Sequence, residues 1–488
     1  MRKWEGDAGM TEPVTVPLWL FAAIAVFAAW SLLDRLLIPS GRWILRRRVN
    51  RLIDSVNRRL RIEIKPFQLT RRQVLVDRLL YDPQVVAAAN EKAKAENIPR
   101  EAAMTEAHRY ASEIVPAFNA YIYFRVGYAL ARAFARALYR VRLGYVDDIA
   151  HARIPPDATI VFVMNHRSNM DYVLVAFLAA ERTALSYAVG EWARIWPLQQ
   201  LIRSMGAYFV RRNSNNPLYR RVLERYVHMA TEAGVAQAMY PEGGLTRDGK
   251  LRPPRLGLVD YALKSFDPQG PRDIVFVPVG INYDRVLEDR TQLRTGDADA
   301  PRQGAGFAIR TTLRFAARNI GQMLRGRWYS FGYACVNFGA PISARDWLAR
   351  TAGRFGGDLR KLDKERRFEV VGALAADVME GIGKVVPVLP VSLVSSVLLE
   401  AEEPIDELEL KGRCAVLLDD LGAAGAKIYL PRGDRDYAIH VGLRMLTLRR
   451  LATVSEDGLY AAVAAERPLL AYYANAIAHL PRIDSTAA

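Results

Sequence analysis

The chain has 488 residues, of which 51% are hydrophobic and 25% are charged; this composition excludes a disordered chain and allows one large or two modest domains. Its two cysteines, Cys335 and Cys414, are too few for a disulfide framework and lack metal-ligand spacing. The formal net charge of +16 indicates an anionic partner, and nucleic acid, lipid head groups and phosphorylated metabolites all fit.

The first predicted element is the uncharged segment at residues 14–33, VTVPLWLFAAIAVFAAWSLL. Its length matches the roughly 20 residues that a helix needs to cross a membrane. Arginines crowd its C-terminal side, so the positive-inside rule places the chain from residue 35 onward in the cytoplasm. We therefore predict a membrane anchor over residues 1–40. A cleaved signal peptide and a helix lying flat in the interface are the alternatives; the acidic leader and the lack of a small-residue cleavage site disfavour the first.

Residues 41–148 are predicted to form a basic, helical, membrane-proximal region, with a helical pair at residues 82–115 that breaks near Pro99. Residues 121–142, YIYFRVGYALARAFARALYRVR, combine apolar residues at helical spacing with arginines. A basic amphipathic helix near a membrane anchor is typical of an element attracted to anionic lipids. The alternative is a helix packed on the domain with a solvated basic face.

From about residue 149 to 345, short apolar runs alternate with amphipathic ones, which predicts an α/β domain with a mainly parallel sheet flanked by helices. The predicted strands are residues 158–164, 207–212, 235–241 and 273–283. The predicted helices are residues 170–180, 192–205, 217–233 and 255–265. Residues 346–488 are predicted to form a helical C-terminal region, in which the apolar run 385–399 is too short for a second membrane span.

Polar residues interrupt VFVMNHRSNMDYVLVAF (residues 161–177) between the first predicted strand and its helix. Helix capping by the serine or asparagine of this stretch explains them. Catalysis is the other explanation, because a carboxylate such as Asp171 on one imidazole nitrogen of His166 leaves the other nitrogen free as a base. The spacing of five residues is not evidence by itself, since His479 and Asp484 repeat it in the C-terminal tail.

Further polar and cationic residues follow the ends of the other predicted strands. They are Arg211 and Arg212 in GAYFVRR, Glu242, Gly243, Gly244, Thr246 and Arg247 in YPEGGLTRDGK, and Pro278 in FVPVGINY. Each has an ordinary explanation as a strand edge, a glycine turn or a strand-ending proline. Because the carboxyl ends of parallel strands meet at one edge of a sheet, we expect these residues to gather beside His166. Guanidinium groups and glycine amides together suit a phosphate.

HRSNMD, GAYFVRR, YPEGGLTRDGK and FVPVGINY, in this order and at these distances, resemble the four motifs of the glycerolipid acyltransferases, and among these the membrane-bound bacterial glycerol-3-phosphate 1-O-acyltransferases. By this resemblance, His166 is the general base on the acceptor hydroxyl and Asp171 orients it. The arginines and the loop that contains Glu242 bind the acceptor, chiefly its phosphate, and Pro278 shapes the pocket floor. The resemblance implies no metal and no cofactor. Leu245 stands where the family usually has an arginine.

The resemblance implies transfer of a fatty acyl group from acyl-CoA or an acyl-carrier-protein thioester to the sn-1 hydroxyl of glycerol 3-phosphate. From this resemblance, together with the apolar segment at residues 14–33 and the basic helices after it, we expect an anionic phospholipid membrane as partner and a place in the bacterial inner membrane, with the catalytic domain facing the cytoplasm. Dihydroxyacetone phosphate or a lysophospholipid is the nearest alternative acceptor. The alternative of another class is a non-enzymatic basic membrane protein that binds anionic lipid or nucleic acid. It explains the charge but not the strand-end residues, so we expect no nucleic acid partner.

Overall fold

The computed structural model describes residues 17, 64–179, 183–190, 198–211, 214–296, 331–356 and 358–482. The predicted anchor, apart from Pro17, lies outside these residues, and so does Arg212. The chain divides into two compact units, Met1–Arg58 and Arg59–Ala488, and the fold below is that of the second. Among the described residues, no helix combines the length and the apolar character that a membrane crossing needs. The predicted domain boundaries at residues 40, 148 and 345 stay predictions.

An eight-stranded sheet lies at the centre of this unit, in the order β1-β7-β6-β2-β5-β3-β4, with β8 paired to β6. Its strands are β1 (Arg140–Val146), β2 (Thr159–Met164), β3 (Ser186–Val189), β4 (Ala207–Phe209), β5 (Gln237–Met239), β6 (Ile274–Tyr283), β7 (Tyr333–Phe338) and β8 (Ile342–Ser343). β6 is antiparallel to β7 and β8, and the other pairs are parallel. The prediction of a mainly parallel sheet is confirmed, with β2, β4, β5 and β6 at the four predicted strands.

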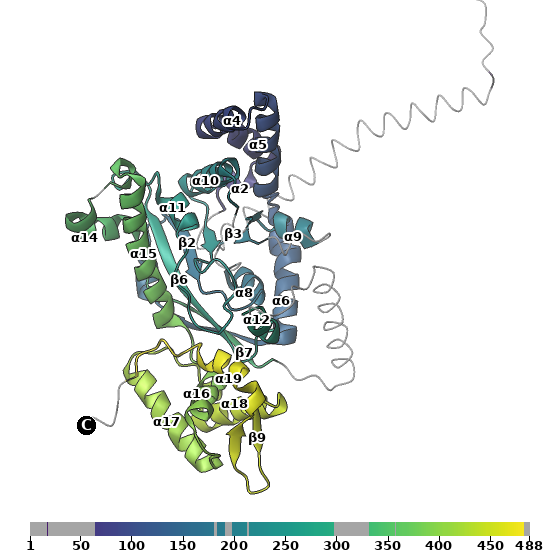
Figure 1. The fold of residues 1–488 in the computed structure, drawn as a ribbon, viewed down its shortest axis with the longest axis vertical. Helices are drawn as coiled ribbons and strands as arrows, with labels where there is room; N and C mark the ends of the chain where they lie inside the picture. Colours follow the sequence, from purple (N-terminus) through teal and green to yellow (C-terminus); the bar gives the residue numbers. More distant parts are fainter. Residues whose placement is uncertain are drawn as a thin grey trace, which may run out of the picture. The chain divides into compact units, whose positions relative to one another are not determined.

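Helices cover both faces of the sheet (Figure 1). They are α6 (Tyr128–Leu138), α7 (Asp148–Ala152), α8 (Met170–Ala179), α9 (Leu198–Ser204), α11 (Gly257–Leu263), α12 (Asp289–Gly296), α14 (Ala344–Phe355) and α15 (Lys364–Val385). Successive residues of a strand point to opposite faces, and every residue of β2 is buried. Phe162 therefore joins the core on the side of α6 and α8, while Val161 joins the core beneath α11 and α15.

Four further helices precede the sheet and pack on α10 (Pro217–Glu232) through an apolar core of their own. They are α2 (Pro66–Leu69), α3 (Arg72–Leu80), α4 (Pro83–Ala95) and α5 (Arg100–Ile114). The predicted helical pair at residues 82–115 is confirmed. The two helices are separated at the predicted Pro99, which occupies the N-cap position of α5 in an extended conformation.

The prediction of one helix over residues 121–142 is wrong at its C-terminal end. A π-helix (Ile122–Gly127) leads into α6, and the chain then turns extended at Tyr139 and enters β1, which pairs with β7. Tertiary pairing overrides helical periodicity here, since the residues after Tyr139 are rich in valine and tyrosine, which suit a strand. α6 buries Ala131, Ala135 and, at its C-terminal end, Leu138, and it leaves Leu130 and Phe134 exposed.

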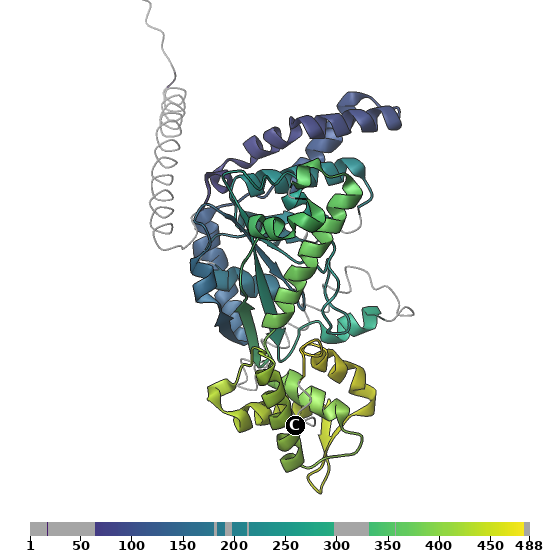
Figure 2. The same ribbon diagram turned by 90° about the vertical axis from the view of Figure 1, so that its left-hand side faces the viewer.

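The C-terminal region is a helical cluster around α16 (Pro390–Glu400), which is buried along almost its whole length. Around it lie α17 (Glu407–Ala423), α18 (Arg435–Leu448), α19 (Arg467–Ala474) and a hairpin of β9 (Ala452–Val454) and β10 (Tyr460–Ala462). Figure 2 shows these elements together at one end of the sheet. The apolar run at residues 385–399 is therefore buried: it leaves the end of α15 and enters α16, which has Pro390 at its first position, where a missing N–H costs nothing.

Candidate active site

His166 and Asp171 meet in the turn between β2 and α8. Nδ1 of His166 lies 2.9 Å from Oδ2 of Asp171, and both side chains are buried. The contact that we predicted from the sequence is confirmed. With Nδ1 protonated and donating to the carboxylate, Nε2 carries the lone pair that a general base needs. No described residue hydrogen-bonds to Nε2.

The carboxylate of Asp171 has further partners that fix its orientation. Oδ2 also accepts the backbone N–H groups of Arg167 (2.8 Å) and Ser168 (3.1 Å), and Oδ1 accepts the hydroxyl of Tyr283 at 2.5 Å. Helix capping is present in the same turn, because Oγ of Ser168 accepts the N–H of Met170 at 3.1 Å. The two explanations of this sequence thus describe one structure: capping shapes the turn that presents Asp171 to the imidazole.

Glu242, predicted to bind substrate, hydrogen-bonds to the backbone of the turn that contains His166. Its Oε1 accepts the N–H of His166 at 2.9 Å, and its Oε2 accepts the N–H of Arg252 at 3.2 Å. The N–H of Thr246 donates to the carbonyl of His166 at 3.0 Å. Burial raises the pKa of Glu242 to about 7, against the backbone hydrogen bonds, which lower it. The loop after β5 therefore hydrogen-bonds to both the backbone N–H and the backbone carbonyl of His166.

Other residues around His166 were given no role from the sequence. The ring of Tyr240 lies 4.1 Å from that of His166, centroid to centroid, and Tyr172 meets it edge-on at 5.4 Å. The carboxylate of Glu288 accepts hydrogen bonds from the hydroxyl of Ser168 at 2.7 Å and from the N–H of Asn169 at 3.2 Å. Burial raises the pKa of Glu288. Tyr240 begins the motif YPEGGLTRDGK and Tyr283 ends the motif FVPVGINY, so their places at the ends of strands next to β2 could have pointed to them.

Arg211, at the end of β4, is not brought to His166. Its guanidinium forms a two-point ion pair with Glu113 of α5, at 2.9 and 2.6 Å, and lies over the rings of Tyr110 and Tyr219. The structure thus gives this cation a carboxylate from the N-terminal helices, and a role in binding substrate stays a prediction. Arg212 lies outside the described residues.

The remaining predicted residues shape the loop after β5 or lie elsewhere. Gly243 has φ +70°, a conformation that favours glycine, and its N–H donates to Tyr240 in a tight turn with Gly244. The hydroxyl of Thr246 accepts the N–H of Gly249 at 3.0 Å, and Arg247 is exposed. Pro278 lies on the α15 face of the sheet, where its Cγ would come within 2.9 Å of a Cβ placed on Gly381.

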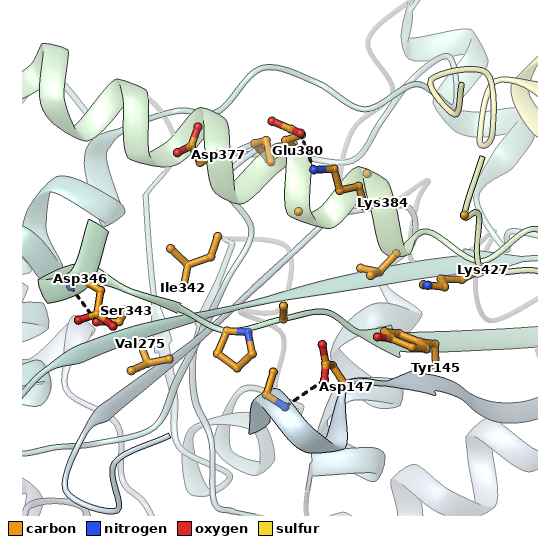
Figure 3. Close-up of a pocket in the computed structure, with 18 of the residues that line it drawn as sticks. Tyr145, Asp147, Val275, Ile342, Ser343, Asp346, Asp377, Glu380, Lys384 and Lys427 are labelled. Atoms are coloured by element: carbon orange, nitrogen blue, oxygen red, sulfur yellow. Dashed lines mark hydrogen bonds and ion pairs between the residues drawn. The ribbon is translucent and has the colours of Figure 1, made fainter. Parts of the chain in front are cut away.

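A cavity of about 1530 Å³ among the described residues does not include His166 in its lining. It opens between α15, which contributes Asp377, Glu380 and Lys384, and the end of β1 with Tyr145 and Asp147 (Figure 3). Five acidic and five basic side chains line it, so it has no marked preference for an anion. It extends to His479, the histidine of the repeated spacing, which bonds the carbonyl of Gly383 and whose pKa burial lowers. No described cluster of histidine, cysteine or carboxylate side chains could hold a metal ion.

Two family models match the chain. Residues 148–282 match the acyltransferase family, and residues 319–488 match the glycerol-3-phosphate acyltransferase C-terminal region. The chain carries an acyltransferase domain joined to that C-terminal region. The two matches together span the catalytic turn, the loop after β5 and the whole helical cluster around α16.

Curated relatives agree with these matches. Glycerol-3-phosphate acyltransferase of Pseudomonas aeruginosa (strain UCBPP-PA14) is 31% identical over 373 residues, which is 75% of this chain and 43% of that protein. The enzyme of the same name from Xanthomonas campestris is 27% identical over 450 residues, 89% of this chain and 48% of that protein. The chain spans about half the length of the curated relatives it matches. A solved structure, the 1-acyl-sn-glycerophosphate acyltransferase PlsC of Thermotoga maritima, matches at 16% identity and a TM-score of 0.29, over 57% of this chain and 81% of that one.

Proposed function

We propose that the chain transfers a fatty acyl group from a thioester, of CoA or of an acyl-carrier protein, to the sn-1 hydroxyl of glycerol 3-phosphate, giving lysophosphatidic acid. The observation that carries this proposal is the buried His166–Asp171 pair, whose Nδ1–Oδ2 contact leaves Nε2 of the imidazole with no hydrogen-bond partner in the described part of the chain. The relatives named glycerol-3-phosphate acyltransferase support the choice of acceptor.

The chemistry is direct acyl transfer. Nε2 of His166 takes the proton of the acceptor hydroxyl while the oxygen attacks the thioester carbonyl, and a carbon–oxygen bond forms. The tetrahedral oxyanion then collapses, the carbon–sulfur bond breaks, and the imidazolium returns its proton to the leaving thiolate. Asp171 stabilises the imidazolium through Nδ1 in the meantime, and Tyr283 and two backbone N–H groups hold its carboxylate in place.

The phosphate of the acceptor needs cations near the catalytic turn. The loop after β5 offers Arg247, and Arg212 follows β4 by sequence. We assign these two the main contacts, with Gly243 and Gly244 supplying backbone amides. Arg211 takes a smaller share because Glu113 already neutralises it. Leu245, in place of an arginine, makes Arg247 the cation of this loop on which the proposal depends.

The acceptor can be tested with the purified full chain in detergent. Thiol release from palmitoyl-CoA is measured with glycerol 3-phosphate, dihydroxyacetone phosphate and lysophosphatidic acid in turn. We expect release with glycerol 3-phosphate and formation of lysophosphatidic acid. Release with lysophosphatidic acid alone would overturn the assignment of the acceptor, and salt-sensitive nucleic-acid binding without any transfer would favour the non-enzymatic alternative.

We further propose that residues 14–33 anchor the protein in the bacterial inner membrane, with the catalytic domain on the cytoplasmic side. The exposed face of α6 and the preceding turn supports a membrane partner. Val126, Leu130 and Phe134 are 40%, 53% and 51% exposed. Residues 121–146 contain five arginines and no acidic residue. An exposed apolar stripe among arginines suits the head-group region of anionic lipids.

The membrane face can be tested with an environment-sensitive dye on Phe134→Cys, using Val416→Cys on α17, 53% exposed, as the matched control. The two native cysteines are buried and do not compete for the label. In vesicles that contain phosphatidylglycerol, we expect a blue shift at position 134 and none at position 416. Equal responses at both positions would contradict this orientation.

A further inference from the structure

Arg167, the residue after the candidate base, is a buried cation with an unusual set of partners. Its side chain is 2% exposed. One terminal nitrogen donates to the carbonyl of Gly249 at 2.9 Å, the other lies 3.5 Å from the carbonyl of Tyr472, and the guanidinium lies 5.1 Å from the centre of the Tyr472 ring. No described carboxylate forms an ion pair with it, and its Nε has no described hydrogen-bond partner. Burying a cation without a paired carboxylate is costly, so the fold needs a compensating role for it.

The carbonyls that Arg167 contacts come from two parts of the chain. Gly249 belongs to the loop after β5, and Tyr472 belongs to α19 in the C-terminal region. The backbones of these two parts touch, since a Cβ on Gly249, at φ +86°, would lie 1.9 Å from the carbonyl oxygen of Tyr472. Asn475 also donates to the carbonyl of Asp248 at 2.8 Å. The side chain of Arg167 therefore reaches the place where the two parts meet.

The main chain of Arg167 is tied to the same helix. Nε2 of Gln292 donates to the carbonyl of Arg167 at 3.0 Å, and the hydroxyl of Tyr472 donates to Oε1 of Gln292 at 2.8 Å. The hydroxyl of Tyr472 also donates to the carbonyl of Arg167 at 3.4 Å, so this tyrosine of α19 contacts Arg167 through its carbonyl, ring and hydroxyl and also by way of Gln292. This is a fixed link between the C-terminal region and the turn that contains His166.

The charge of Arg167 acts on Glu242, the carboxylate that accepts the N–H of His166. Four groups act on Glu242: the N–H groups of His166 and Arg252 and the positive charge of Arg167 favour its ionised form, and the charge of Asp171 opposes it. Burial, the largest influence, raises the pKa of Glu242 to about 7, so its ionisation at neutral pH depends on these partners.

We infer that Arg167 is a positioning residue, which joins α19 to the catalytic turn and supplies the positive charge that keeps Glu242 an acceptor for the N–H of His166. This inference rests on the proposed acyl transfer for its effect on rate, but its structural content does not. It assigns the C-terminal region a task in catalysis: α19 holds the turn in which the base lies, without touching substrate.

The test compares Arg167→Gln with Arg167→Lys in the full chain in detergent, by hydrogen exchange of the backbone amides of residues 166–169 between pH 6 and 8. These four N–H groups bond to Glu242, Asp171 or Glu288. After correction for intrinsic exchange, we expect protection in Arg167→Gln to be about tenfold lower than in the wild type. As the pH is lowered, we also expect this variant to lose protection at a higher pH than the wild type does. Arg167→Lys, which keeps the charge, retains the wild-type pH dependence.

Tyr472→Phe serves as the second variant, because it removes the hydroxyl link to Gln292 without changing any charge. We expect lower protection at residues 166–169 with an unchanged pH dependence, and a lower kcat with an unchanged KM. Wild-type protection in both folded variants would overturn the inference. A wild-type chain that transfers no acyl group would instead refute the proposed function, and the exchange result would still decide whether Arg167 holds the turn.

Discussion

The sequence predicts site residues at the ends of both β2 and β4, yet in the structure the surroundings of the two strand ends differ. At the end of β2, His166 and Asp171 are buried and hydrogen-bond to two other segments, the loop after β5 and the end of β6. At the end of β4, the Arg211 side chain stays 31% exposed and pairs with Glu113 of an N-terminal helix. Strand order alone places both at one edge of the sheet. The two strand ends differ in their hydrogen-bond partners. A site forms where residues on neighbouring strands and their loops hydrogen-bond to the same turn.

The largest effect that sharpens this contrast is expected from Tyr283→Phe. The change removes a hydrogen bond to the charged carboxylate of Asp171, worth about 1.5–3 kcal/mol, and we expect kcat to fall by about 10- to 100-fold. Tyr139→Phe is the matched control, because this buried neighbour donates to the carbonyl of Arg285 instead. Steady-state kinetics decide it: similar losses in both variants would mean that packing, not the bond to Asp171, matters.

A smaller effect concerns stability and pH. Burial raises the pKa of Glu242 from 4.5 to about 7 and that of Asp284 from 3.8 to about 7. Each group binds its proton more tightly in the folded state, so its contribution to the free energy of unfolding is full below the unfolded pKa and is lost as pH rises to about 7. We expect Glu242→Gln and Asp284→Asn each to weaken this pH dependence.

Urea unfolding at pH 5 and pH 8 measures that contribution as the difference between wild type and variant. Asp284 provides an independent case, since it accepts N–H groups of Tyr333 and Val391 and belongs to no predicted motif. A variant that shows the same pH dependence as the wild type would contradict the assignment for its residue.

The smallest effect is expected at the end of β4. Arg211→Ala removes a partly exposed ion pair, worth about 0–1 kcal/mol, and we expect a small loss of stability and little change in the acceptor's KM. Arg212→Ala should raise that KM more, with kcat retained. The control is Glu113→Gln, which frees Arg211 without removing it. If Arg211→Ala raised KM more than Arg212→Ala, the two strand ends would belong to one site and the contrast would fail.

Much of this fold was predictable because apolar periodicity and proline positions are local signals. The four predicted strands and their helices, the pair broken at Pro99 and the buried helix at Pro390 follow from them, while β1, β3, β7 and β8 were not predicted. β1 was missed because its pairing with β7 joins residues nearly 200 apart, and its sequence continues the spacing of α6.

The site was predictable only in part, for the same reason. The contact of His166 with Asp171 lies within one turn, so spacing and context were enough. Tyr283, Glu288 and Tyr472 contact that turn from positions 112 to 305 residues away from their partners; Tyr283 lies in the motif FVPVGINY, but no local pattern shows which residue each of them contacts. Arg211 lies in a motif that is easy to see in the sequence, but the carboxylate that pairs with its guanidinium comes from α5, and the motif does not indicate this partner.

The central claim is that His166 acts as the base of an acyl transfer, and one comparison tests it most directly. Formation of lysophosphatidic acid from palmitoyl-CoA and glycerol 3-phosphate is measured for His166→Ala and for His479→Ala, the histidine with the same spacing to an aspartate. We predict that the first variant loses at least about 10²- to 10⁴-fold in kcat and that the second retains wild-type turnover. Equal losses in the two variants, or full activity in His166→Ala, would contradict the account.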